Sequence, residues 1–135
     1  MLSELKKRSS EFKNTKVIQG DITKLSEILE KEDIKNPVLM LVQNTLETIE
    51  GDWKKVLEEM KKIAEKYHGE IIISFFRQEA LKNWGIDLYS SISEMTGEPD
   101  LEKTEFDRGI FVSKKGYTSK WRSREEIQDI KKFFR

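Results

Sequence analysis

The sequence predicts an α/β fold in three layers, with helices covering both faces of a mostly parallel sheet. Residues 38–42 and 70–76 are nearly continuous apolar runs, as expected for strands buried on both faces. Between them, residues 52–67 carry apolar side chains at helical spacing, which predicts one amphipathic helix. Two buried strands joined through a helix are expected to form a right-handed βαβ unit.

Three further elements are predicted before this unit. Residues 2–12 place Leu and Phe among Lys, Arg and Glu, which indicates a short surface helix. Residues 16–22, KVIQGDI, indicate a short strand closed by a Gly-Asp turn. Residues 23–30 space their apolar side chains along one helical face and indicate a helix. Asn36-Pro37 then favours an extended backbone leading into the first buried strand.

The central helix has signals at both ends. Asp52 is a favourable N-cap residue, and Gly69 stands where a left-handed residue is expected to stop the helix. After the second buried strand, residues 80–95 predict another helix, interrupted by Gly85 and ended by the turn at 97–99.

The C-terminal part predicts a β-hairpin followed by a helix. Residues 110–113 and 117–121 are β-rich runs around a short turn that contains Gly116. Ser123 and Glu126 fit the S-x-x-E capping box, which marks the start of a final helix.

The chain of 135 residues is long enough for one hydrophobic core and one domain. Within residues 1–135, we assign the core to 16–96 and the hairpin and terminal helix to 108–135.

Composition excludes several kinds of chemistry. The 25 basic and 25 acidic residues give a net charge of 0, which argues against a dedicated nucleic-acid or membrane-surface protein. The absence of Cys excludes disulfides, thiolate metal sites and thiol nucleophiles. His68 is the single histidine, so a His-rich metal site is excluded as well, and no metal is expected.

The first residues are charged, and no apolar run approaches the ~20 residues that a membrane span needs. We therefore expect no signal peptide, no membrane span and a cytoplasmic location. Charged residues make up 37% of the chain, mainly Lys and Glu, a bias found in many thermophile proteins.

Polar side chains follow both buried strands at the point where each run ends. Gln43, Asn44 and Thr45 come directly after the first run, and Arg77 follows the second. Open α/β sheets bind ligands at the carboxyl ends of their strands. The sequence therefore predicts that a ligand site lies at this edge.

Taken in order, four segments resemble class I S-adenosylmethionine-dependent methyltransferases. VIQGDI at 17–22 is similar to the family's third strand and the loop after it, and residues 38–49 are similar to the fourth strand and its loop. Residues 53–76 resemble the next helix and the fifth strand, and residues 109–127 resemble a substrate-side insertion of some members. The resemblance implies an incomplete Rossmann-like sandwich with a β-hairpin insertion near the C-terminus.

The resemblance also implies S-adenosylmethionine as the cofactor. The cofactor-binding residues that it implies are Gly20, Asp21 and Ile22 beside the adenine, and Gln43, Asn44 and Thr45 beside the methionine. The alternatives are a simple turn that caps a helix at Asp21 and a polar loop that satisfies strand-end backbone groups at 43–45. No catalytic residue is identified, because positioning of the acceptor supplies much of the rate of methyl transfer.

Four residues are candidates for binding the methyl acceptor, whose identity the sequence does not reveal. They are Arg77, Tyr89, Tyr117 and Trp121. Arg77 could hold an anionic group with two parallel hydrogen bonds, and the alternative is a solvated or salt-bridged arginine. For the aromatic residues the alternative is a place in the core.

The chain departs from the family at both ends. No two of its seven glycines form the G-x-G of the family's cofactor loop, and the family's last two strands have no counterpart. The resemblance thus indicates a truncated domain that is not fully competent alone. The missing strands would leave an unpaired sheet edge, which invites pairing with another chain. We therefore expect a homodimer or another self-associated form.

Two other functions remain open. The first is a non-catalytic module that self-associates. The second is an RNA-binding domain that uses the basic hairpin at 108–124, where Lys and Arg alternate with aromatic residues able to stack on bases.

Overall fold

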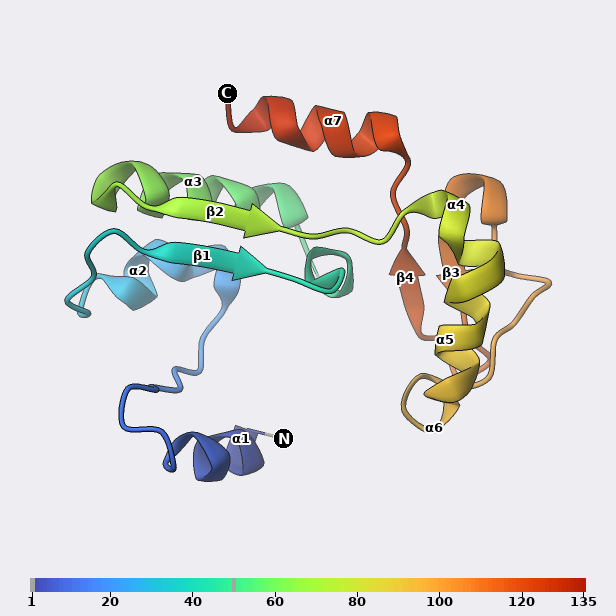
Figure 1. The fold of residues 1–135 in the computed structure, drawn as a ribbon, viewed down its shortest axis with the longest axis horizontal. Helices are drawn as coiled ribbons and strands as arrows, with labels where there is room; N and C mark the ends of the chain where they lie inside the picture. The colour runs from blue at the N-terminus through green and yellow to red at the C-terminus, as the bar shows by residue number, and fades with distance from the viewer. Residues whose placement is uncertain (1, 50) are drawn as a thin grey trace.

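The chain folds as a mixed α/β protein, and the computed structural model describes residues 2–49 and 51–135 (Figure 1). The helices are α1 (Leu2–Ser9), α2 (Leu25–Leu29), α3 (Trp53–Tyr67), α4 (Gln78–Ala80), α5 (Ile86–Ser91), α6 (Ser93–Thr96) and α7 (Arg124–Phe133). The strands are β1 (Val38–Leu41), β2 (Glu70–Ile73), β3 (Ile110–Val112) and β4 (Thr118–Lys120). Short 3₁₀ turns span Ile22–Lys24, Thr45–Thr48 and Phe106–Arg108, and a π-helical turn spans Leu81–Gly85.

The predicted β-α-β unit is confirmed as a parallel pair of strands connected by α3. In the register of this pair, Val38 lies opposite Glu70 and Leu41 lies opposite Ile73. Asp52 caps α3 as expected, because its carboxylate accepts a hydrogen bond from the Lys54 N–H at 3.0 Å.

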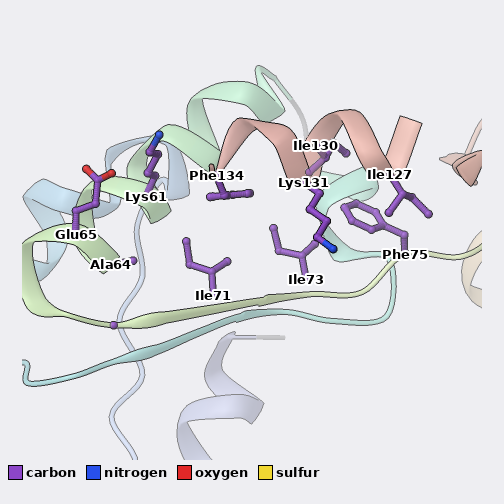
Figure 2. A pocket seen from close by; sticks show the side chains of 11 residues that line it. Lys61, Ala64, Glu65, Ile71, Ile73, Phe75, Ile127, Ile130, Lys131 and Phe134 are labelled. Atoms are coloured by element: carbon purple, nitrogen blue, oxygen red, sulfur yellow. The ribbon is translucent and has the colours of Figure 1, made fainter. Parts of the chain in front are cut away.

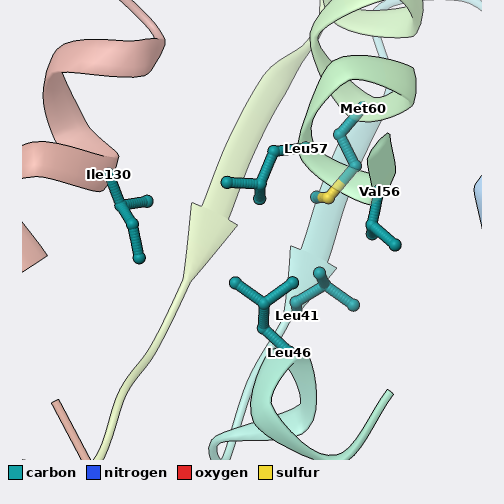
Figure 3. Packing of buried hydrophobic residues seen from close by; sticks show 6 residues of the cluster. All are labelled: Leu41, Leu46, Val56, Leu57, Met60 and Ile130. Carbon is teal, nitrogen blue, oxygen red and sulfur yellow. The ribbon is translucent and has the colours of Figure 1, made fainter. Parts of the chain in front are cut away.

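The helices α3 and α7 lie side by side over one face of β2 (Figure 2). The first core is formed by the apolar stripe of α3, Leu41 of β1, Leu46 of the following 3₁₀ turn and Ile130 of α7 (Figure 3). Its buried members are Leu41, Leu46, Val56, Leu57, Met60 and Ile130. Burial of such side chains is the main stabilising contribution to this half of the chain.

The opposite face of this sheet is open. Val38, Met40 and Ile72 alternate with the core-facing residues and are 53%, 58% and 44% exposed. Our expectation that both faces of these strands are buried is therefore wrong for the described residues. A continuous apolar run is compatible with burial of both faces of a strand. It does not show that the chain has a helix to cover the second face.

The strand predicted at 16–22 is absent. Residues 15–21 have no regular structure, and the 3₁₀ turn begins at Ile22. A strand forms only where a neighbour offers backbone hydrogen bonds, and the sheet of β1 and β2 has no third member among the described residues. Gly20 instead lies against Ile28, where a Cβ would come within 2.4 Å of the Ile28 Cδ1.

The helix predicted at 23–30 is confirmed in α2, which α3 holds in place. The buried Glu59 of α3 accepts a hydrogen bond from the Ser26 N–H at 2.8 Å and another from Lys62 at 2.8 Å. Burial alone would raise the pKa of Glu59, but the hydrogen bonds from Lys62 and Ser26 outweigh it and lower this pKa to about 2.

The end of α3 differs from our prediction. His68, not Gly69, adopts the left-handed conformation, with φ of 54°. Gly69 is required for a different reason, since a Cβ there would lie 2.5 Å from the carbonyl oxygen of Pro37. The close approach of the two strand starts therefore explains the glycine.

The helix predicted at 80–95 forms as α4, the π-helical turn, α5 and α6 in succession. Gly85 does not break it; a Cβ there would lie 2.8 Å from the Trp121 ring. These helices and the antiparallel β3-β4 hairpin enclose a second core cluster of Leu81, Tyr89, Phe111 and Trp121.

The hairpin and the last helix are as predicted. The capping box at the start of α7 is complete: the Ser123 hydroxyl accepts from the Glu126 N–H at 3.2 Å, and the Glu126 carboxylate accepts from the Ser123 N–H at 2.8 Å. No helix in the described part of the chain has both the length and the apolar character that a membrane crossing requires.

Candidate functional site

The loop after β1 has an unusual backbone. Gln43 and Asn44 are consecutive left-handed residues, with φ of 55° and 63°. Their N–H groups donate to the Ser74 hydroxyl at 2.8 Å and to the Ser74 carbonyl at 3.3 Å. This conformation costs about 1 kcal/mol or more for each non-glycine residue, and such strain is often found at functional sites.

The side chain of Asn44 is 2% exposed and fully engaged. Its Nδ2 donates to the Ser119 hydroxyl at 3.2 Å and to the Lys120 carbonyl at 2.9 Å, while its Oδ1 accepts from the Phe76 N–H at 3.1 Å. The residue thereby joins the ends of β1, β2 and β4. These contacts match the alternative in which the loop satisfies strand-end backbone groups.

A buried ion pair lies beside this loop. Arg122 Nε donates to Glu47 Oε1 at 2.5 Å and Arg122 Nη2 donates to Oε2 at 3.2 Å, and the two side chains are 10% and 5% exposed. The guanidinium carbon also stands 4.7 Å from the centre of the Trp53 ring. Together with Asn44, this pair closes the carboxyl edge of β1 and β2 with the chain's own segment 119–122.

The residues predicted beside the adenine form a separate turn. Asp21 is exposed and accepts hydrogen bonds from the N–H and the hydroxyl of Thr23, at 2.9 and 2.7 Å. These bonds lower the pKa of Asp21 below its ordinary value. Gly20 and Ile22 flank it, and none of the hydrogen bonds found in residues 2–49 and 51–135 joins this turn to the loop at 43–45.

Thr45 and Arg77 make local contacts. The Thr45 hydroxyl donates to the Val42 carbonyl at 2.5 Å. Arg77, which is about half exposed, forms a bidentate pair with Glu79 at 2.6 and 3.1 Å. An anionic substrate would have to displace Glu79 to reach this guanidinium.

The three aromatic candidates lie together: Tyr89 and Trp121 belong to the second core cluster, and Tyr117 packs against it. Tyr89 is 3% and Trp121 is 0% exposed, and the Trp121 Nε1 donates to the Tyr89 hydroxyl at 3.1 Å. Tyr117 is half-buried, and burial raises the pKa of its phenol. Phe111 is also fully buried, so in this conformation neither it nor Trp121 presents a face on which an RNA base could stack.

A groove with a volume of about 560 Å³ lies away from all these residues, between α3, α7 and β2 (Figure 2). The sequence did not lead us to expect this space. The alternating Ile71, Ile73 and Phe75 and the helical spacing of Ile127, Ile130 and Phe134 predict packed faces, but not the space between them. In the described part of the chain, no group of acidic and histidine side chains is arranged to hold a metal ion.

Comparison with known proteins gave no match to a family model, to a curated protein or to a solved structure.

Proposed function

We propose that this chain is the central part of a class I S-adenosylmethionine-dependent methyltransferase, with an incomplete Rossmann-like sandwich and an unknown methyl acceptor. The observation that carries the proposal is the parallel β1-α3-β2 unit, with its strained, hydrogen-bonded loop at the carboxyl edge. The two segments resemble the family's fourth and fifth strands, which are neighbours in its sheet. The pairing of β1 with β2 agrees with that resemblance.

The open face of the sheet supports the proposal that the domain is incomplete. Val38, Met40 and Ile72 would be covered if a second helix layer packed there. Among the described residues, β1 is hydrogen-bonded to a neighbouring strand on one side only, so further strands could pair with its other edge.

The residues present do not form a complete pocket for the cofactor. The Asn44 amide is fully engaged, and the pair of Glu47 and Arg122 fills the strand edge beside it. The side chains that remain exposed at these two loops are those of Asp21, Gln43 and Thr45. We therefore expect the isolated chain to bind the cofactor product weakly and to be incompetent in methyl transfer by itself.

Titration with S-adenosylhomocysteine, followed by amide chemical shifts, tests this function. We expect saturable shifts with a Kd of about 1 mM, which corresponds to about 4 kcal/mol of binding free energy, confined to residues 20–22 and 43–45. Asp21→Asn should weaken binding while preserving the cap of the following turn, because Asn is an equally good cap. The matched control is Asp33→Asn, an exposed acid in another loop. Unperturbed shifts at both loops would overturn the proposal.

The open sheet face also favours the second candidate function, a self-associating module with no catalytic role. We expect the chain to dimerise at tens of micromolar through the face formed by Val38, Met40 and Ile72. Met40→Glu should weaken the dimer at least about tenfold, because a carboxylate would be buried against apolar side chains. Met95→Glu on α6, where the parent side chain is 84% exposed, is the control. Sedimentation velocity that shows only monomer for the parent chain would exclude this function.

A further inference from the structure

We propose that the groove between α3, α7 and β2 binds a small amphipathic carboxylate, a molecule with one unbranched apolar chain and one anionic head. This site is separate from the methyltransferase-like loops and does not depend on that function.

The groove has the size and lining of a ligand site. Its volume of about 560 Å³ lies within the range of about 300–1,000 Å³ found for small-molecule pockets. The floor is formed by Ile71, Ile73 and Phe75 of β2 and the segment after it (Figure 2). The α7 wall is also apolar and consists of Ile127, Ile130 and Phe134.

The shape favours an extended chain. Ile71 and Phe75 are four residues apart on an extended segment, so the floor is roughly 13 Å long. Ala64 and Gly69 line the far end, where their small size leaves room for the end of an apolar tail.

The charges orient the ligand. Lys131 points from α7 into the groove, beside Ile73 and Phe75 (Figure 2). Within the described residues, no carboxylate lies within ion-pair distance of its ammonium group. An anion there would gain a charge-assisted hydrogen bond over an apolar floor. Lys61 and Glu65, one cation and one anion, line the opposite end, so Lys131 gives its own end the net positive charge that favours the anionic head there.

The rim excludes a larger occupant. Lys61 of α3 donates to the Phe133 carbonyl of α7 at 3.3 Å and lies 5.7 Å from the Phe133 ring centre. This contact bridges the two helices above the floor. A partner helix, about 10 Å wide, would have to break it, whereas an alkyl chain would not.

The test is a titration with dodecanoate below its micelle concentration, followed by calorimetry and by the methyl shifts of Ile71 and Ile73. We expect saturable one-to-one binding with shifts confined to the groove. Dodecyltrimethylammonium, which has the same tail and a cationic head, should bind at least about tenfold more weakly, a difference of about 1.4 kcal/mol.

Two variants and a control locate the head and the tail. Lys131→Gln should weaken dodecanoate binding about tenfold and leave dodecanol binding unchanged. Lys132→Gln is the matched control, because Lys132 pairs with Asp129 and does not line the groove. Ala64→Phe should fill the tail end and abolish binding, with an unchanged circular dichroism spectrum. Absence of dodecanoate binding, equal affinities for the two lysine variants, or a change of oligomeric state on addition of dodecanoate would overturn the proposal.

Discussion

Replacing Arg122 by alanine is expected to lower the free energy of unfolding by about 3 kcal/mol or more. The change would leave the Glu47 carboxylate, 5% exposed, without its bidentate partner, and an unpaired buried charge is strongly destabilising. It would also remove the guanidinium that stands over the Trp53 ring. Urea denaturation followed by circular dichroism measures the loss.

The exposed pair of Arg77 and Glu79 supplies the control. It has the same residue types and bidentate geometry, but both side chains are about half exposed or more. Arg77→Ala should therefore cost about 1 kcal/mol or less. In a double-mutant cycle, adding Glu47→Ala to Arg122→Ala should recover part of the loss, because the buried charge is then gone. Equal costs for the two arginine variants would contradict the assignment of a buried, structural pair.

Replacing Gly109 by alanine is the second change with a large expected effect. Gly109 has a φ of 65°, and a Cβ there would lie 2.0 Å from the Trp121 carbonyl oxygen. The left-handed backbone costs about 1–2 kcal/mol with a Cβ, and the clash with backbone adds about 1–3 kcal/mol. We expect a total of about 3 kcal/mol, seen as a lower midpoint of thermal unfolding.

Gly116 separates these two contributions. It has a φ of 83° in the hairpin turn, and nothing lies within 4 Å of the position of its Cβ. Gly116→Ala should therefore show the backbone cost alone, about 1–2 kcal/mol. If both variants lost the same stability, the close contact between Gly109 and Trp121 would not be present in solution.

Local signals in the sequence predicted much of the fold. The stripe and N-cap of α3, the capping box of α7 and the Gly-containing hairpin turn depend on residues within a few positions of one another. The strand expected at 16–22 is absent because a strand needs a neighbouring strand, and the sequence of the segment does not show whether that neighbour is present. We predicted the left-handed conformation at Gly69, but it occurs at His68. Gly69 is instead required by its close approach to the Pro37 carbonyl oxygen, a contact that the local sequence does not reveal.

The candidate site depends on contacts between distant segments, which one sequence does not reveal. Asn44 and Glu47 reach residues 119 to 122, about 75 positions further along the chain. The polar loop at 43–45 could be predicted from its place after β1, but its closure by the hairpin could not. The groove was missed for the same reason, since it exists only where α7 returns to β2.

The closure of the strand edge by segment 119–122 also sets an order of events. During synthesis the β1-α3-β2 unit emerges well before the hairpin, and its carboxyl edge stays uncovered until Arg122 arrives. Domains generally fold as units, and closing so long a loop is slow compared with forming a helix, so this edge is completed late. A ligand that binds at this edge of the folded chain would therefore have to displace the contacts that Asn44 and Glu47 make with segment 119–122.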